Sequence, residues 1–345
     1  MKKKTWIFII AGALVLLAVI VLLLLNSFFK PVKKIDGSIP YNESSSYMPY
    51  NDSFIEISKD GVVTEYSVSS ETNSIKKTGS FHINLPIKKY ISSNLFITED
   101  NSIMFGSIKG TEQKNLGTVK NATDISVGTG VDHALMRTAV VTSDGLLFVQ
   151  GDNSTGALGI EAKQVNGEFV QVPYLQNIAK AICGINCILV LSTDGEVFLS
   201  GTLGELSYQT FTKLEVAEKV KDIEASDISN TLIALGVNGN VYEIGISFFQ
   251  DLTYINDAPH DGVFYSSFHK IPRLKNIVFM TTPDLTAYAI DKNDKAYYWG
   301  SDMMGKSIFL EKVFKQIYGL PKYDKIWHNS YFYVLSGNEI KAYSW

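Results

Sequence analysis

The sequence predicts an all-β fold, a seven-bladed β-propeller preceded by one N-terminal transmembrane α-helix. Three observations predict this fold: an uninterrupted apolar stretch near the N-terminus, a strand–turn–strand pattern that recurs seven times, and turns made only of Gly, Asn and Asp. The chain of 345 residues therefore divides into a short cytoplasmic tail (1–4), a transmembrane signal anchor (5–29), a juxtamembrane stalk (30–50) and the propeller (51–345).

The apolar stretch runs from Trp6 to Leu25 and has the length of a membrane span. Its twenty residues carry no charge, and a helix rising about 1.5 Å per residue over this length matches the roughly 30 Å hydrocarbon core of a bilayer. A cleaved signal peptide has a shorter apolar region of about 7–15 residues, followed by a small-residue cleavage site. Neither condition holds here, so we expect an uncleaved, single-pass anchor in the cell membrane.

Lysines flank the apolar stretch on both sides, so charge alone gives only a small preference in orientation. They are Lys2, Lys3 and Lys4 before the stretch and Lys30, Lys33 and Lys34 after it. The terminal amine adds to the first group, and the positive-inside rule then places the N-terminus in the cytoplasm. A single span followed by a large domain is also typical of a signal anchor that exports the domain. We expect the propeller to be extracytoplasmic.

The composition is that of a folded chain and argues against several kinds of partner. Hydrophobic residues make up 46% of the sequence and charged residues 19%, which excludes a disordered tail. Without the three N-terminal lysines the chain holds 28 basic and 35 acidic groups, and this balance opposes binding to nucleic acid. There are two cysteines, and the five histidines share no metal-type spacing. We expect no cofactor, no metal and no nucleic-acid partner.

The recurring unit is a β-hairpin in which a two-residue turn joins two apolar-rich strands. Gly, Asn and Asp tolerate the positive φ of a tight hairpin turn at the least steric cost. The second turn residues are separated by 40, 44, 50, 44, 55 and 44 residues, a period that suits propeller blades of about four strands each. The seven turns are Asp60-Gly61, Asp100-Asn101, Asp144-Gly145, Asp194-Gly195, Asn238-Gly239, Asn293-Asp294 and Gly337-Asn338.

Other features of the repeat agree with blades that stack face to face. The first hairpin strands, such as ILVL at 188–191 and LIAL at 232–235, are apolar on both faces, as strands covered on both sides should be. The seventh repeat ends at Trp345 without an outer strand, so we expect a segment within residues 36–50 to supply it and close the ring. Glycine ends most second hairpin strands, where the chain turns sharply or approaches another backbone: Gly106, Gly151, Gly201, Gly245 and Gly300.

The third and fourth repeats resemble the regulator-of-chromosome-condensation repeat. In that family a Cys-Gly-x-x-His stretch precedes an apolar run, an Asp-Gly turn and a strand that ends in Gly-x-Asn-x-x-Gly-x-Leu-Gly. Here CGINC at 183–187 takes the first position, with Cys187 in place of the histidine, and residues 144–159 match the rest, with Ala157 in place of the usual Gln. The resemblance is specific over residues 138–201 and implies a seven-bladed propeller. Family members include an exchange factor for a small GTPase and secreted bacterial propellers that bind other proteins.

The longest repeat spacing contains an insertion at 246–272 that is rich in aromatic residues. Aromatic side chains on loops often mark binding surfaces, because they bury much area at a small entropic cost. The alternative is that they pack the insertion against the fifth or sixth blade. The candidate binding residues are Phe248, Phe249, Tyr254, Phe264, Tyr265 and Phe268.

Two shorter motifs have structural interpretations. Cys183 and Cys187 are expected to be free thiols packed in the sheet, with a small disulfide across the turn as the alternative. Asp152-Asn153-Ser154 superficially suggests a calcium loop, but the ligand spacing and the terminal Glu are missing, so we expect turn-forming hydrogen bonds there. No residue of the chain is identified as catalytic.

Together these observations predict a membrane-anchored, extracytoplasmic β-propeller that acts as a protein-binding or recognition module. One alternative is a hydrolase or lyase acting on a glycan or peptide at the central pore, although no catalytic motif points to an enzyme. Several Asp, Glu or His side chains converging on the pore would favour that alternative. The other is a cytosol-facing protein similar to a guanine-nucleotide exchange factor, which requires the reverse topology.

Overall fold

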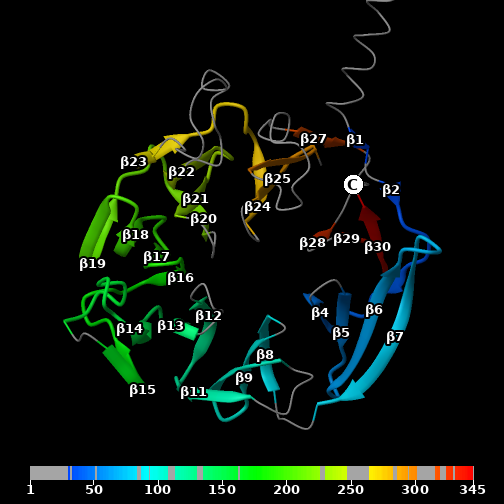
Figure 1. Ribbon diagram of the computed structural model, residues 1–345, viewed down its shortest axis with the longest axis horizontal. Helices are drawn as coiled ribbons and strands as arrows, with labels where there is room; N and C mark the ends of the chain where they lie inside the picture. Colours follow the sequence, from blue (N-terminus) through cyan, green and yellow to red (C-terminus); the bar gives the residue numbers. More distant parts are fainter. Residues whose placement is uncertain are drawn as a thin grey trace, which may run out of the picture.

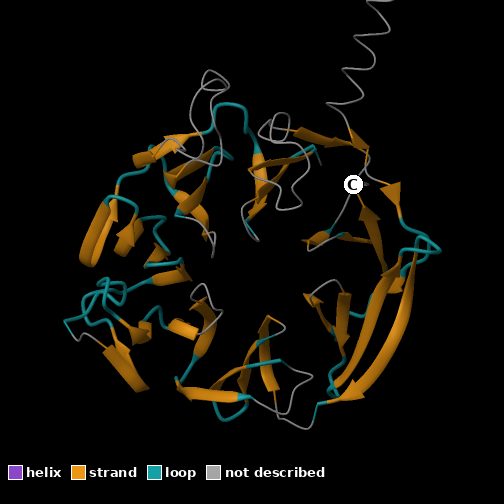
Figure 2. Cartoon of the chain, viewed as in Figure 1, coloured by secondary structure: helices purple, strands orange, loops and turns teal. Residues whose placement is uncertain are grey.

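The chain folds into seven β-sheets arranged in a ring (Figure 1, Figure 2). The computed structural model describes residues 30–31, 33–50, 53–83, 87–92, 94–107, 113–129, 135–161, 164–225, 230–246, 264–282, 286–293, 295–300, 315–318, 324–328 and 331–344. The expected all-β, seven-bladed propeller is confirmed. Within the described ranges there is no helix long and apolar enough to cross a membrane, and the expected tail and anchor at 1–29 lie outside those ranges.

Each sheet is one blade, and its strands follow the sequence from the axis of the ring outwards (Figure 1). Blade 1 contains β4 (Ser46–Tyr50), β5 (Ser53–Ile57), β6 (Val62–Ser69) and β7 (Ser74–His82). Blade 2 contains β8 (Ile87–Ser92), β9 (Leu95–Thr98), β10 (Ser102–Phe105) and β11 (Lys114–Thr118). Blade 3 contains β12 (Ala122–Thr129), β13 (Leu135–Thr142), β14 (Leu147–Asp152) and β15 (Gln164–Gln171). Blade 4 contains β16 (Ile178–Cys183), β17 (Cys187–Ser192), β18 (Val197–Leu203) and β19 (Leu206–Leu214).

The last three blades follow the same order, and two of them receive strands from the N-terminal segment. Blade 5 contains β20 (Val220–Ala225), β21 (Thr231–Gly236), β22 (Val241–Ile246) and β23 (Phe264–Lys270). Blade 6 contains β24 (Ile277–Thr281), β25 (Thr286–Asp291), β26 (Ala296–Gly300), β27 (Lys315–Tyr318) and β1 (Lys30–Pro31). Blade 7 contains β28 (Lys325–His328), β29 (Phe332–Ser336), β30 (Glu339–Ser344), β2 (Lys33–Lys34) and β3 (Ile39–Pro40).

Most hairpin loops are longer than the two-residue turns expected from the sequence. In blade 3 the strand pairing stops at Val141 and Leu147, and the N–H of Gly145 donates to the carbonyl of Thr142 at 2.9 Å. Such a loop needs a single left-handed residue at its end, which leaves the Asp before it with ordinary φ. Among the seven hairpins expected from the sequence, blade 7 keeps the shorter form, with Gly337 and Asn338 between a paired Ser336 and Glu339. The left-handed loop residues are Gly61, Asn101, Gly145, Gly195 and Gly239.

One hydrophobic cluster lies between each pair of neighbouring blades, including blades 7 and 1. The strand β17 is buried along its whole length, because alternate side chains enter two different clusters. Ile188 and Val190 pack toward blade 3, whereas Leu189 and Leu191 pack toward blade 5. The apolar hairpin strands therefore have the two-sided burial that the sequence predicts.

The N-terminal segment closes the ring by adding strands to blades 6 and 7. Both β2 and β3 pair with β30, and β1 runs parallel to β27. Asp36 reaches blade 1, where its N–H donates to the carbonyl of Asn73 at 3.0 Å and its carbonyl accepts the N–H of Ile75 at 2.8 Å. The closing strand expected within 36–50 is β3, whereas β4, in the same range, is the innermost strand of blade 1. The segment 30–50, expected as a stalk, thus contributes four strands to the ring.

Candidate functional site

Four successive blades place a charged side chain at the same position of the innermost strand. The position follows a register shift near the start of the strand, such as the shift between Ile178 and Lys180 in β16. The inner strands surround the axis of the ring (Figure 1), so this position forms a row there. The sign of the charge alternates from blade 2 to blade 5: Lys89, Asp124, Lys180 and Asp222.

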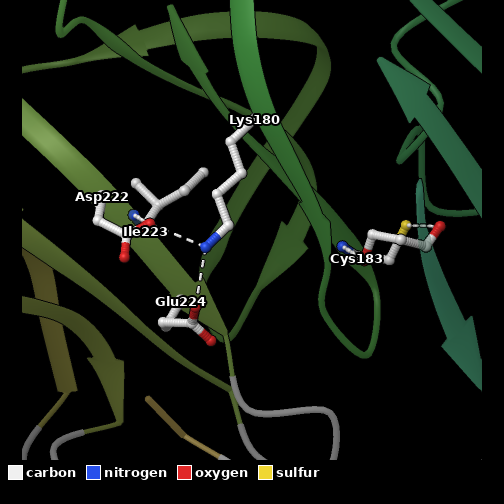
Figure 3. Close-up of polar contacts among 6 residues, drawn as sticks. Lys180, Cys183, Asp222, Ile223 and Glu224 are labelled. Carbon is white, nitrogen blue, oxygen red and sulfur yellow. Dashed lines mark hydrogen bonds and ion pairs between the residues drawn. The ribbon is translucent and has the colours of Figure 1, made fainter. Parts of the chain in front are cut away.

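Lys180 joins blade 4 to blade 5 through two ion pairs (Figure 3). Its Nζ lies 2.8 Å from Oδ1 of Asp222 and 2.8 Å from Oε1 of Glu224, and both carboxylates come from β20. Oδ1 of Asp222 also accepts the N–H of Ile223 at 2.9 Å. The three side chains are 27%, 34% and 22% exposed in the order Lys180, Asp222, Glu224, so part of the cluster faces solvent.

Partial burial makes the protonation of this cluster depend on its partners. Burial raises the pKa of Glu224 above its ordinary value, and the opposing effect of Lys180 does not cancel this increase. Burial acts to lower the pKa of Lys180, but Glu224 and Asp222 outweigh it and raise that pKa. One ammonium group against two carboxylates leaves an excess of negative charge when all three are ionised, so the cluster attracts cations.

Asp124 and Lys89 extend the row toward blades 3 and 2 without forming an ion pair. Burial raises the pKa of Asp124, and the positive charges of Lys180 and Lys89 oppose that increase. The Nζ of Lys89 donates to the main-chain carbonyl of Thr123, the neighbour of Asp124. The row therefore spans four blades, with a hydrogen bond between blades 2 and 3, an electrostatic effect between Asp124 and Lys180, and ion pairs between blades 4 and 5.

A second set of contacts holds blades 3 and 4 together beside the row. The N–H of Cys183 donates to Oγ of Ser126 at 2.9 Å. Arg137 on β13 is 1% exposed, and its Nη1 donates to the carbonyls of Gly184, at 3.1 Å, and Ile185. These bonds fix the end of β16 that follows Lys180, so the cluster sits on a rigid support.

The aromatic candidates of the insertion divide into two groups. Phe248, Phe249 and Tyr254 lie outside the described residues, and Phe264, Tyr265 and Phe268 are half-buried in β23. The structure brings the second group together on one outer strand, away from the charged row on the inner strands.

The described aromatic residues make contacts within the propeller. The ring of Phe264 covers Gly204 of blade 4 so closely that a Cβ on this glycine would lie 2.3 Å from it. Phe268 packs against the cluster between blades 4 and 5, and Tyr265 stacks on His269 with ring centroids 4.3 Å apart. These contacts reach blade 4, whereas the packing alternative named the fifth or sixth blade, and a role in binding a partner stays a prediction.

The other predicted motifs have the structural roles expected for them. Both cysteines are buried free thiols. Oδ1 of Asn153 accepts the N–H of Leu158 at 2.7 Å, and Oδ1 of Asp152 accepts the N–H of Ser154 at 3.1 Å, which is turn-forming chemistry. Within the described ranges, no group of three or more His, Cys, Asp or Glu residues could hold a metal ion.

The charged row could not be found by counting residues from the hairpin turns. Lys180 precedes Gly195 by 15 residues, whereas Asp222 precedes Gly239 by 17 and Asp124 precedes Gly145 by 21. The connection between the first two strands of a blade varies in length, so the inner strands are out of phase in the sequence. The equivalence becomes visible when the inner strands alone are aligned with one another. Aligning IAKAIC with VKDIEA, for example, places Lys180 opposite Asp222.

The comparisons with known proteins bear on the fold. No known protein-family model matches the chain. The structure of yeast RCC1 (Prp20) with Kap60 aligns with a TM-score of 0.55 at 12% identity, over 86% of this chain and 79% of that one. The structure of Prp20p from Saccharomyces cerevisiae, described with its binding to Gsp1p and histones, aligns with a TM-score of 0.57 at 12% identity. The alignment covers 86% of this chain and 81% of that one. The structure of human WBSCR16 aligns with a TM-score of 0.52 at 15% identity, over 86% of this chain and 75% of that one.

Identities this low show a shared fold and carry no residue roles from one protein to another. The blade count, the order of strands within the blades and these alignments agree with one another. The chain is a seven-bladed β-propeller that is structurally similar to RCC1 (Prp20) and WBSCR16, which are RCC1-like repeat proteins.

Proposed function

We propose that this protein is a membrane-anchored, extracytoplasmic propeller that binds a partner protein at the inner ends of blades 4 and 5. The observation that carries the proposal is the partly exposed cluster of Lys180, Asp222 and Glu224, with its excess of negative charge. The partner surface that complements it carries a Lys or Arg side chain, which the two carboxylates can accept. A rigid ring suits this task, because a preorganised surface loses little entropy on binding.

The fold comparison supports a binding role. Kap60 is bound to yeast RCC1 (Prp20) in one of the similar structures, and Prp20p is described with its binding to Gsp1p and histones. RCC1-like propellers thus bind proteins, and we extend this general property to the present chain without extending their partners. Membrane anchoring is proposed from the apolar stretch between Trp6 and Leu25.

Site-specific photo-crosslinking in native membranes tests the binding proposal. A photoreactive residue at exposed position 179, next to Lys180 on β16, leaves the cluster intact and should give a discrete crosslinked product, and the same residue at exposed position 168, on the outer strand β15, serves as the control. Loss of the crosslinked product in Glu224→Gln would show that binding of the partner depends on the negative charge of the cluster. Crosslinking of equal yield from both positions, or from neither, would contradict a partner at the inner strands.

Protease treatment of intact cells tests the topology. Digestion of the propeller from outside supports the extracytoplasmic orientation. A propeller that is protected in intact cells and digested after lysis would instead favour the cytosol-facing alternative, similar to an exchange factor.

A hydrolase or lyase is the second candidate, and one observation favours it. Asp124, Asp222 and Glu224 bring three carboxylates to the inner strands of blades 3 and 5, and burial raises the pKa of two of them, Asp124 and Glu224. A carboxyl with a raised pKa is suited to general acid catalysis. Turnover of a glycan or peptide that disappears in both Glu224→Gln and Asp124→Asn would favour the enzyme over the binding module.

A further inference from the structure

The segment that precedes the ring enters it at one fixed place on the perimeter. β1 lies on blade 6 and β2 on blade 7, side by side in Figure 1. The N–H of Ile35 donates to the carbonyl of Ala342 at 2.9 Å, and the side chains of Ile35 and Ile39 are completely buried. Asp36 continues the attachment to blade 1. The main chain of Lys30 is therefore held at the junction of blades 6 and 7, because β1 itself pairs with a strand of the ring.

Little chain separates this junction from the apolar stretch. Five Cα steps lead from Leu25 to Lys30, and an extended chain covers at most about 3.6 Å per step, or about 18 Å in total. The headgroup region occupies roughly 5–8 Å on each side of the hydrocarbon core. Lys30 thus lies within roughly 10–13 Å of the headgroup surface when the stretch spans a bilayer, which is about one Debye length at 0.1 M salt.

The charge at the junction suits a bilayer surface with anionic lipids. Lys33 and Lys34 are both exposed in β2 and come three and four residues after Lys30. Adjacent residues of a strand point to opposite faces, so the two ammonium groups cover both sides of the edge. Lysines held this close to anionic headgroups are attracted to them.

We propose that the outer wall of the ring at blades 6 and 7 faces the membrane, with Lys33 and Lys34 against anionic lipid headgroups. This inference rests on the membrane anchoring proposed above. The occupant of the surface is the bilayer that holds the chain itself, and the opposite wall, at β15 of blade 3, points away from it (Figure 1). The axis of the ring is then tilted away from the membrane normal. The charged row on the inner strands therefore stays accessible to a partner.

Depth-dependent fluorescence quenching in vesicles tests this orientation with the full-length chain. A thiol-reactive fluorophore is placed at Lys34→Cys or at Glu168→Cys, an exposed position on β15. The unsubstituted chain is the labelling control, because its two cysteines are buried. Vesicles of phosphatidylcholine with phosphatidylglycerol carry a quencher in the headgroup region. We expect at least threefold stronger quenching at position 34 than at position 168.

A charge variant then tests the role of the lysines. Lys33→Glu, added to the chain labelled at position 34, should reduce quenching at least twofold in vesicles with phosphatidylglycerol and leave it unchanged in pure phosphatidylcholine. Lys114→Glu, at an exposed position on the outer strand β11 of blade 2, is the matched control and should have no effect. An equal loss in both lipids, or an equal loss in both variants, would overturn the role of the headgroups.

The failure of the anchor and the failure of the orientation give different results. A chain that does not float with the vesicles in a density gradient contradicts membrane anchoring and, with it, this inference. A chain that floats but is quenched equally at positions 34 and 168, or more strongly at 168, retains its anchor and overturns the orientation alone.

Discussion

Cys183 and Cys187 lie on opposite faces of blade 4, although only three residues separate them. Cys183 pairs with Ile188 and enters the hydrophobic cluster shared with blade 3. The N–H of Gly184 donates to the carbonyl of Cys187 at 2.9 Å. The side chain of Cys187 enters the cluster shared with blade 5. Neighbouring positions of a strand point to opposite faces, so the sheet itself separates the two thiols.

The two cysteines should therefore remain reduced and unreactive in the folded protein. Burial raises the pKa of Cys183 to about 11 and that of Cys187 to about 12, so neither forms a thiolate near neutral pH. We expect no alkylation of the native chain and two alkyl groups per chain in denaturant, measured by intact mass without reductant. Denatured chains that accept the label only after reduction would show a disulfide and contradict this topology.

Removal of the Lys180 ammonium group should destabilise the propeller. Lys180→Met leaves Asp222 and Glu224 beside each other without their shared cation. The cluster is partly solvated, so we expect a loss of about 1–3 kcal/mol, between the values typical of exposed and buried pairs. Chemical unfolding at pH 7 measures the change. Lys76→Met on the exposed outer strand β7 is the control, and an equal effect of both variants would show that the ion pairs contribute nothing.

Glu224 should make the stability of the wild-type protein fall as pH rises above about 4.5, the ordinary value for Glu. Its pKa is raised in the folded state, mainly by burial, so the folded chain keeps a proton that the unfolded chain has already released. Glu224→Gln does not titrate and lacks this dependence. We therefore expect the difference in unfolding free energy, variant minus wild type, to increase between pH 4 and pH 7. The increase should be about 1.4 kcal/mol for each unit by which the folded state raises the pKa of Glu224.

Chemical unfolding of the two proteins at several pH values measures this difference. Glu71→Gln, on the exposed tip of the β6–β7 hairpin, controls for the general effect of removing a carboxylate. The proposed effect of burial would be contradicted if the difference in unfolding free energy between wild type and Glu224→Gln stayed constant over this range. It would also be contradicted if the wild type became more stable relative to the variant as pH rises.

Three glycine-to-alanine variants separate backbone strain from steric collision. Gly201 has φ of 95°, and a Cβ there would lie 2.3 Å from the carbonyl oxygen of Asn186. Gly167 has φ of 83° but open space around it, and Gly79 has neither constraint. We expect losses of about 3 kcal/mol or more for Gly201→Ala and about 1 kcal/mol for Gly167→Ala, with almost none for Gly79→Ala. Equal losses at Gly201 and Gly167 would show that the collision relaxes at no cost.

The fold was predictable because its repeated elements carry strong local signals. Loop residues such as Gly145 and Gly195 must adopt positive φ, and the strand that contains Ile188 to Leu191 must be apolar on both faces. These requirements arise from the backbone and from two-sided burial, so they appear in the sequence of almost every blade. The exact loop type was not predictable, because Asp followed by Gly is compatible with loops of two or three residues.

The charged row and the closing strands were harder to predict for different physical reasons. The inner strands of blades 3, 4 and 5 begin at varying distances from the turns, so the equivalence of Asp124, Lys180 and Asp222 exists only in space. β2 and β3 contain two residues each and are too short for any hydrophobic pattern. A closing strand from the N-terminal segment was nevertheless expected, and blade 7 combines β28, β29 and β30 with β2 and β3.

The ring should depend on Ile35 and Ile39 for its closure. Both side chains are fully buried in the cluster between blades 7 and 1, together with Phe54 and Tyr333. Truncation leaves a cavity at the seam where the two ends of the ring meet, and we expect Ile35→Ala or Ile39→Ala to cost about 2–4 kcal/mol. Val170→Ala is the matched control, because Val170 is 38% exposed on the outer strand β15. Thermal unfolding measures all three variants, and a melting temperature of either isoleucine variant equal to that of the control would show that the ring holds together without this segment.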